Sequence, residues 1–391
     1  MKYNFDKVID RSGTSAEKVE GLKHIWGRTD LIPLWVADMD FATAPFVTDA
    51  IRKRCENEVL GYTGKPDSYY NAIINWVKQR YDLIVTKEVI NFVPGIVPGI
   101  GMAMNCFTQK GDKVMIQPPV YHPFAWVTTR NERTLVINPL KWENGMYRMD
   151  LDAFREQIKG CKLFILCNPH NPGGVVWTEA ELRAIADICY DEKVLVFSDE
   201  IHADLTLPPH THRPFATVSE KARMNSVTFM SPSKAFNMPG LSASHALIFN
   251  EDLRKRFRIY MDAGELDMGH VFAFLSVEAA YSHGTEWLDQ CLAYIQGNID
   301  FVDEFLKKHA PKIKAIRPEA SYLVWLDCRE LEFSQKDLNE FFVDKAHLAL
   351  NDGEMFGKEG IGFMRLNVAS PRCIIEKAMK QLADAYQLYI K

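Results

Sequence analysis

The chain has 391 residues, of which 47% are hydrophobic and 25% charged, the proportions of a folded globular protein. This length exceeds what one hydrophobic core usually supports, so two domains are expected. The formal net charge of −5 and the isoelectric point near 6.1 argue against a general nucleic-acid binder, which would present a basic face. The one dense cationic run, Arg254–Arg258, is interpreted as the solvated side of a helix.

The first residues, Met1 to Lys7, lack the apolar centre of a signal peptide, and no later stretch approaches the roughly 18 apolar residues of a membrane span. We therefore expect a cytoplasmic protein with no membrane partner. The eight cysteines are scattered without a Cys-x-x-Cys pair, which indicates neither a disulfide framework nor a zinc ribbon.

Short apolar runs separated by glycine and proline predict the strands of a sheet. Their apolar character is continuous rather than alternating, which is typical of parallel strands buried on both faces. Helices are expected between them, one of them starting at a capping-box pattern formed by Thr178 and Glu181. In such an architecture the sites lie at the carboxyl ends of the strands. The runs are Lys113–Ile116, Thr134–Ile137, Leu163–Cys167, Val194–Phe197, Ser226–Met230 and Ala246–Phe249.

The pattern changes near Tyr294, where a longer helix is followed by apolar runs at Tyr322–Leu326 and Phe363–Leu366. These elements predict a smaller C-terminal α+β domain. We expect an α/β protein in three parts. Residues 1–45 form an N-terminal segment that packs with the small domain, residues 46–285 form a large domain with a mainly parallel sheet flanked by helices, and residues 286–391 form the small domain.

Groups suited to an active site follow several of the runs. The turn Pro94–Gly99 opens a helical stretch, so its backbone N–H groups are able to hold an anion, although such turns are common before helices. Tyr121 follows the first strand and is placed either to stack on a planar ring or only to pack. Asp199 ends a buried strand, where a carboxylate needs a cationic partner or several donors. A helix cap or an ion pair with arginine is the alternative for Asp199.

Lys234, in the segment Ser231–Lys234, is the most informative residue. Neighbours such as Phe236 and Met238 would exclude water from it, which lowers the pKa of the amine and favours its nucleophilic form. A surface lysine in a loop is the alternative if the other groups were absent. A lysine preceded by an acid at a strand end, and by an asparagine in the Pro/Gly-rich loop Asn168–Gly174, is suited to an aldehyde cofactor with a pyridine ring. We infer pyridoxal 5′-phosphate. The lysine would form its Schiff base, the carboxylate would keep the ring nitrogen protonated and the amide would bind the ring hydroxyl.

Three further sets of polar residues have both a functional and a structural interpretation. Ser231 and Ser233 add hydroxyl donors beside the lysine. Arg365 offers a bidentate fork for a substrate α-carboxylate, but an arginine on a strand of a small domain is often only a surface ion-pair member. His210 and His212 alternate in a proline-rich loop without an identifiable third ligand, so no metal site is expected.

These segments occur together and in order, and with them the sequence resembles the fold-type I pyridoxal-phosphate enzymes. Within that class it is similar to the MalY/PatB family of cystathionine β-lyases, also called cysteine-S-conjugate β-lyases, over nearly the whole chain. The segments that carry the resemblance are Pro33–Phe41, Gly61–Thr63, Pro118–Phe124, Asn168–Gly174, Ser198–Leu205, Ser231–Asn237 and Phe356–Arg372.

The resemblance implies a role for each matching residue. Lys234 would be the Schiff-base lysine, Asp199 the partner of the pyridine nitrogen, and Tyr121 the ring that stacks on the cofactor. The loop that begins at Gly95, together with two serines, would hold the phosphate. Tyr62 would reach a phosphate in the neighbouring subunit of a homodimer. The remaining assignments are Gly95, Ile96, Val97, Ser231 and Ser233 for phosphate, Asn171 for the ring hydroxyl, Arg365 and Asn171 for substrate, and Val36 and Ala37 within the pocket segment Trp35–Phe41.

Two departures from related aminotransferases favour a lyase. Many of those enzymes have a tyrosine where this chain has His202, and an arginine a few residues after the lysine, where Pro239–Ser244 supplies none. His202 would donate to the ring hydroxyl or be a packed core histidine. We expect α,β-elimination from an amino acid with sulfur at Cβ, giving a thiol, pyruvate and ammonia, with Lys234 or Tyr121 protonating the sulfur. The alternatives are an aminotransferase and a cofactor-binding regulatory protein.

Overall fold

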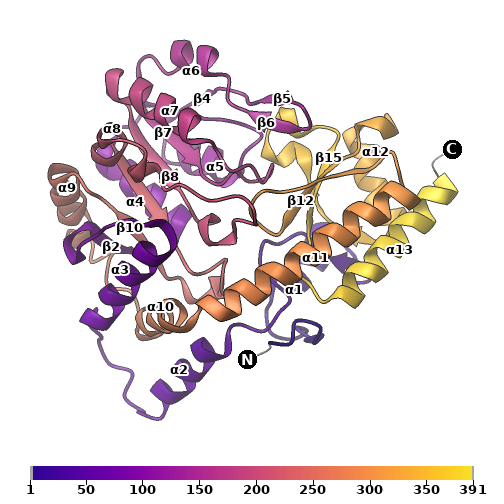
Figure 1. Cartoon of the computed structure of the whole chain (residues 1–391), viewed down its shortest axis with the longest axis horizontal. Helices are drawn as coiled ribbons and strands as arrows, with labels where there is room; N and C mark the ends of the chain where they lie inside the picture. The colour runs from indigo at the N-terminus through magenta and orange to yellow at the C-terminus, as the bar shows by residue number, and fades with distance from the viewer. Residues whose placement is uncertain (1–2, 390–391) are drawn as a thin grey trace.

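A seven-stranded sheet forms the centre of the structure, a computed structural model that describes residues 3–389 (Figure 1). Only β10 runs antiparallel to its neighbours, and the other adjacent pairs are parallel. The prediction of an α/β fold with a mainly parallel sheet is therefore confirmed. In spatial order the strands are β2 (Ile90–Val93), β10 (Ser244–Leu247), β9 (Ser226–Met230), β8 (Leu195–Asp199), β7 (Cys161–Cys167), β3 (Lys113–Ile116) and β4 (Thr134–Ile137).

Strands β3, β4 and β9 have the predicted bounds, whereas β10 does not. The apolar run predicted a strand at Ala246–Phe249, but the strand begins two residues earlier, at Ser244 and His245, and ends at Leu247. Both polar side chains are buried, so apolar content did not indicate where the strand starts. β2 was not predicted at all. Its Asn91 interrupts the apolar pattern, yet the amide is satisfied by the carbonyl oxygens of Val89 and Ala246.

Helices cover both faces of this sheet because successive side chains of its strands point to opposite sides. On β7, Leu163 and Ile165 pack in one core cluster with residues of α4, α5 and α9. Phe164 and Leu166 pack in another with residues of α6, α7 and α8, and α3 and α10 pack further along this second face. The helices are α3 (Asp67–Tyr81), α4 (Ile96–Phe107), α5 (Pro123–Arg130), α6 (Leu151–Gln157), α7 (Glu179–Asp191), α8 (Glu220–Met224), α9 (Glu251–Asp262) and α10 (Val271–His283). The capping box of Thr178 and Glu181 opens α7 as predicted.

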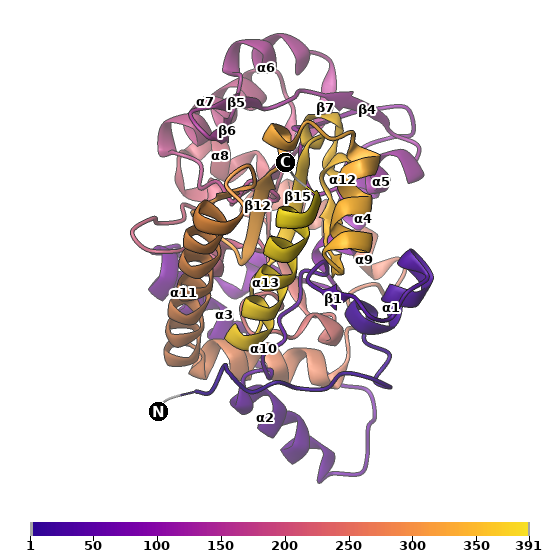
Figure 2. The same ribbon diagram turned by 90° about the vertical axis from the view of Figure 1, so that its right-hand side faces the viewer.

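A smaller antiparallel sheet lies beside the first, with the long helix α11 next to α13 (Figures 1 and 2). The N-terminal segment joins this part of the molecule, since β1 pairs with β13. A short hairpin of β5 and β6 precedes α6, and α2 packs against α10. The bounds are α1 (Glu17–Trp26), β1 (Ile32–Pro33), α2 (Pro45–Cys55), β5 (Lys141–Glu143), β6 (Met146–Arg148), α11 (Thr285–His309), β11 (Lys314–Ile316), β12 (Leu323–Asp327), α12 (Gln335–Glu340), β13 (Leu348–Ala349), β14 (Asn351–Asp352), β15 (Phe363–Asn367) and α13 (Arg372–Tyr389).

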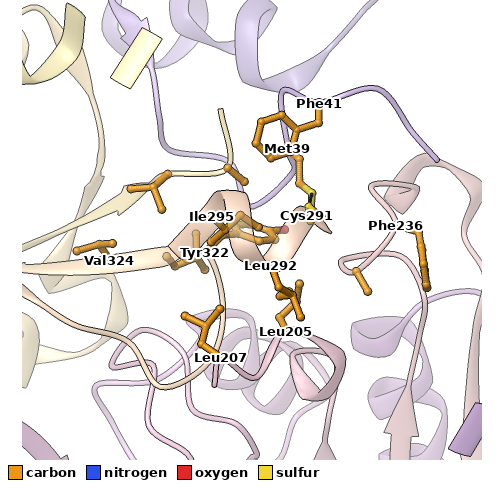
Figure 3. Packing of buried hydrophobic residues seen from close by; sticks show 14 of the residues in the cluster. Met39, Phe41, Leu205, Leu207, Phe236, Cys291, Leu292, Ile295, Tyr322 and Val324 are labelled. Carbon is orange, nitrogen blue, oxygen red and sulfur yellow. Dashed lines mark hydrogen bonds between the residues drawn. The ribbon is translucent and has the colours of Figure 1, made fainter. Parts of the chain in front are cut away.

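One continuous hydrophobic core connects segments far apart in the sequence. Figure 3 shows Met39 of the N-terminal segment beside Cys291 of α11, with Tyr322 and Leu205 close by. The sulfur atoms of Met39 and Cys291 are 3.8 Å apart. This packing fixes the N-terminal segment against both sheets, and the segment therefore reaches the middle of the molecule.

The two sheets also meet at Gly174. Its carbonyl oxygen accepts hydrogen bonds from the backbone N–H groups of Glu319 and Ala320, and Leu207 N–H donates to the carbonyl of Glu319. Gly174 has φ of +68°, and a Cβ there would lie 2.5 Å from Cβ of Pro318. Only glycine allows so close an approach in this conformation. The loop Asn168–Gly174 is thereby fixed to the segment that enters the small sheet.

The cationic run lies on helix α9 with Lys255, Arg256 and Arg258 exposed, as predicted, but its arginines also bond to the backbone of neighbouring segments. Arg254 donates to the carbonyls of Ile248 and Phe249, Arg256 donates to that of Cys106, and Arg258 donates to that of Glu88. These arginines attach α9 to the chain around the sheet edge. Within residues 3–389, no helix is long and apolar enough to cross a membrane.

Candidate active site

A cavity of about 200 Å³ opens at the carboxyl ends of the parallel strands. Ten of the residues singled out in the sequence line it, although they come from six separate segments. They are Ala37, Gly95, Ile96, Val97, Tyr121, Asn171, Asp199, His202, Ser233 and Lys234. The structure thus brings together the lysine, the acid and the asparagine that the sequence places some sixty residues apart along the chain. Val36, Ser231, Arg365 and Tyr62 are not part of the lining.

Lys234 lies just beyond β9, and its side chain is partly buried. Its Nζ donates a 2.5 Å hydrogen bond to the carbonyl oxygen of Ala37, which also accepts from the hydroxyl of Tyr322 at 2.9 Å. Burial and the nearby Arg365 guanidinium lower the pKa of the Lys234 amine to about 8. The amine is therefore available in its neutral, nucleophilic form near neutral pH.

Asp199 is the last residue of β8 and is buried. Its Oδ1 accepts one hydrogen bond, from the backbone N–H of Ile201 at 3.1 Å, and no described cation donates to it. Burial raises the pKa of the Asp199 carboxyl to about 7, and the charge of Glu200 adds to this rise. A buried carboxylate with so few donors calls for a proton-bearing partner inside the cavity.

Arg365 and Asn171 form a pair beside the cavity. Arg365 on β15 is buried, and its Nη1 donates to Oδ1 of Asn171 at 3.0 Å. Its Nη2 donates to Oδ1 of Asn351 and to the carbonyl of Trp35, and its Nε has no partner. The guanidinium also lies 4.7 Å from the ring of Phe356. Arg365 is thus a buried cation without a carboxylate, rather than a surface ion-pair member.

Tyr121 and His202 flank the cavity from different segments. Burial raises the pKa of the Tyr121 hydroxyl, and burial together with the cations Lys234 and Arg365 lowers that of His202 to about 3. The His202 ring is therefore neutral, and its Nδ1 has no hydrogen-bond partner. An unpaired buried nitrogen at a cavity wall is more consistent with a ligand contact than with simple core packing.

One end of the cavity is formed by backbone and hydroxyl groups. Gly95 precedes α4, and no side chain caps the first turn of that helix. Ser233 lines this end as well, whereas the hydroxyl of Ser231 donates to the carbonyl of Ala243 and accepts from Ser233 N–H. Ser231 therefore shapes the loop without lining the cavity. Three lining residues that the sequence did not single out are Ser242, Ser244 and Cys167.

Val36 and Tyr62 lie outside the cavity for different reasons. The carbonyl of Val36 accepts from Nδ2 of Asn367, which holds the segment next to Ala37 in place. Tyr62 is 98% exposed and has Val59 and Leu60 as exposed apolar neighbours.

The two loop histidines do not form a pair. His212 is buried and its Nε2 lies 2.8 Å from Oε2 of Glu200, whereas His210 is partly exposed near Glu319. The interpretation of both as part of a surface loop is therefore wrong for His212. No cluster of potential metal ligands was found among residues 3–389.

Comparison with known proteins fits this geometry. The family model for aminotransferase class I and II matches residues 29–382. The chain belongs to this family. It is 38% identical to cystathionine beta-lyase PatB of Bacillus subtilis over 98% of this chain and 99% of that protein. This degree of similarity confirms the MalY/PatB resemblance.

Two solved structures have the same fold. Cystalysin from Treponema denticola, a crystal structure containing pyridoxal 5′-phosphate, matches with a TM-score of 0.96 and 33% identity over 99% of both chains. The PLP-bound C-S lyase from Staphylococcus hominis matches with a TM-score of 0.91 and 35% identity over 98% of both chains. The predicted fold-type I architecture is therefore confirmed.

Proposed function

We propose that this protein is a pyridoxal-phosphate-dependent carbon–sulfur β-lyase that cleaves L-cystathionine or another cysteine S-conjugate to a thiol, pyruvate and ammonia. The lyase class and the cofactor predicted from the sequence are confirmed by full-length relatives with these properties. The physiological substrate is the new part of the proposal. The observation that carries the proposed chemistry is one cavity containing a lysine amine of lowered pKa and a buried carboxylate without a cationic partner.

The residues of the cavity fit the cofactor. Asp199 needs a donor that no described side chain supplies, and the protonated ring nitrogen of pyridoxal phosphate is such a donor. His202 Nδ1 and the amide of Asn171 are available at the wall for the ring hydroxyl. We assign the uncapped first turn of α4 at Gly95, Ile96 and Val97, with Ser233 nearby, to the phosphate. Tyr121 is assigned to the ring face.

We assign Arg365 to the α-carboxylate of the substrate. It is a buried guanidinium without an acidic partner, and a carboxylate arriving beside Asn171 would supply that missing charge. The lining residue Ala37, with Val36 next to it, would bound the substrate on the opposite side.

The chemistry divides between the cofactor and the chain. When bound, pyridoxal phosphate accepts the electron pair that is released as the substrate loses its Cα proton. Lys234 would hold the cofactor until the substrate amine displaces it, and its freed neutral amine would then take that proton, while Asp199 would hold the proton of the ring nitrogen. The electron pair from the Cα–H bond would form the Cα–Cβ double bond as the Cβ–S bond breaks with its own pair on sulfur, and Lys234 or Tyr121 would return a proton to the thiolate. The three-carbon remainder is hydrolysed to pyruvate and ammonia.

We also propose a homodimer in which Tyr62 of each subunit reaches the phosphate in the other. A tyrosine that is 98% exposed beside exposed Val59 and Leu60 is suited to an interface rather than to solvent. Among the described residues that line the cavity Lys234 is the one cation, and its amine is assigned to the aldehyde of the cofactor rather than to the phosphate. A further donor from a second chain would help to hold a phosphate there.

We divide the chain into an N-terminal segment (1–45), a large cofactor-binding domain (46–285) and a small domain (286–391). The pairing of β1 with β13 and the start of α11 at Thr285 support these limits. We expect a cytoplasmic enzyme that acts on a small amino acid and has no nucleic-acid or membrane partner.

The test is incubation of the purified protein with cystathionine in the absence of a keto acid. We expect equal amounts of pyruvate and thiol, and a Lys234→Ala variant that lacks the visible absorbance of the covalently held cofactor. An aminotransferase would need a keto acid and release no thiol. A regulatory protein would bind the cofactor without turnover. Comparing cystathionine, cysteine, cystine and an S-alkyl cysteine would then identify the substrate class.

A further inference from the structure

Glu200 lies next to Asp199 in the sequence but has no place in the reaction described above. Its side chain is fully buried and turns away from the cavity. The two carboxylates stand at the end of one strand, because Asp199 ends β8 and the N–H of Glu200 still donates to the carbonyl of Phe229 on β9. Two adjacent buried acids are costly unless each has its own partners.

Glu200 has a full set of donors within the protein. Its Oε1 accepts from the hydroxyl of Ser198 and from the backbone N–H of Phe215, both at 2.8 Å, and its Oε2 lies 2.8 Å from Nε2 of His212. Both side chains of the Glu200–His212 pair are at most 1% exposed. These contacts also fasten the loop 207–215 to the end of β8. Three donors hold the carboxylate in one orientation.

The charge of Glu200 acts on Asp199, which has no comparable set. Burial raises the pKa of Asp199, and Glu200 is the negative group that adds to this effect, while the cation Lys234 opposes it. The other ionisable groups facing Asp199 are the uncharged Cys167 and Tyr121. Glu200 is therefore the one described acid that increases the proton affinity at the cavity side of this strand.

We propose that Glu200 is a positioning residue that strengthens the hydrogen bond between Asp199 and the protonated ring nitrogen of the cofactor. Glu200 itself is held by Ser198, His212 and Phe215. The proposal rests on the proposed function, because it assumes that pyridoxal phosphate occupies the cavity. It assigns to the buried Glu200–His212 contact at the end of β8 a role in keeping the ring protonated at neutral pH, the state in which the ring withdraws electrons best.

The test is the pH titration of the ring nitrogen of bound nitrogen-15-labelled pyridoxal phosphate, followed by its NMR chemical shift, in the holoenzyme and in Glu200→Gln. Removing a negative charge on the order of 9 Å away, at an effective dielectric constant near 20 to 40, lowers the midpoint of the ring-nitrogen titration by about 0.7 to 1.4 pH units. We expect this downward shift in Glu200→Gln, with the cofactor still bound. An unchanged midpoint in a folded, cofactor-loaded variant would overturn the proposal.

Asp204→Asn is the matched control. Asp204 is another buried acid of the same turn, bonded to Trp76 and Tyr81, and it is not among the groups that perturb Asp199. Its variant is expected to keep the wild-type midpoint, and an equal shift there would contradict the proposal by showing general damage.

If Glu200→Gln does not fold, His212→Gln serves instead. It keeps the charge of Glu200, so its midpoint is expected to be no lower than that of the wild type, and a fall would refute the idea. A wild-type protein without any cofactor absorbance would refute the proposed function instead.

Discussion

Replacing Asp199 by asparagine is expected to raise the free energy of unfolding of the cofactor-free protein and to lower that of the cofactor-bound enzyme. The folded chain raises the pKa of this carboxyl from 3.8 to about 7, chiefly through burial. The folded state therefore binds the proton more tightly than the unfolded state, and stability falls as the pH rises from about 4 to about 7. A rise of this size corresponds to roughly 4 kcal/mol of lost stability at pH 8, and to less than about 2 kcal/mol at pH 5.

The assay is urea unfolding of the wild type and Asp199→Asn after the cofactor has been removed with hydroxylamine and dialysis. The neutral amide avoids the cost of a buried charge, so the variant is expected to be more stable at pH 8 by up to that amount, with most of the gain gone at pH 5. With the cofactor bound the order is expected to reverse, because asparagine cannot pair as an anion with a protonated ring nitrogen. Equal stability of the two cofactor-free proteins at pH 8, or a gain of the same size at both pH values, would refute the reasoning.

Three further outcomes are expected. Arg365→Lys removes the bidentate guanidinium and with it one charge-assisted hydrogen bond of about 1.5–3 kcal/mol to the substrate carboxylate. The KM for cystathionine is therefore expected to rise roughly ten- to hundredfold. An unchanged KM in pyruvate-release assays would show that Arg365 does not bind the carboxylate. Tyr62→Phe is expected to lower the affinity for pyridoxal phosphate about tenfold with no change in folding, and cofactor retention on dilution that equals the wild type would count against the shared site. Gly174→Ala places a Cβ 2.5 Å from Pro318 at φ of +68° and is expected to destabilise by roughly 2 kcal/mol or more in urea unfolding. Gly111→Ala, at φ of +86° with no atom within 4 Å of the new Cβ, is the control and is expected to cost only about 1 kcal/mol.

The sequence predicted most of the central sheet because its strands are buried on both faces and have continuous apolar side chains. β3 and β9 appear at the predicted residues for this reason. Strands β2 and β10, the first two in the spatial order of the sheet, break this pattern. β2 contains Asn91 and β10 begins with Ser244 and His245, all of them buried polar residues. Asn91 is satisfied by backbone carbonyls across the sheet, which no local pattern reveals.

Strand β10 also explains which residues of the site the sequence did not predict. Asp199 and Lys234 follow parallel strands, so their meeting at one sheet edge could be expected from the order of elements alone. Ser244 begins the antiparallel strand β10, and the start of an antiparallel strand lies at the edge where its parallel neighbours end. A search of strand ends therefore passes over Ser242 and Ser244. The burial of His212 also depends on a contact between the loop and β8 that only the folded chain shows.

The junction at Gly174 bears on how substrates enter. The loop that carries Asn171 is bonded through the Gly174 carbonyl to Glu319 and Ala320, and Asn171 itself accepts from Arg365 on the small sheet. A hinge between the two sheets would have to break these bonds at the site itself. We therefore expect the sheets to move as one rigid body here, and the route for substrate to open through displacement of the surface segments around the cavity.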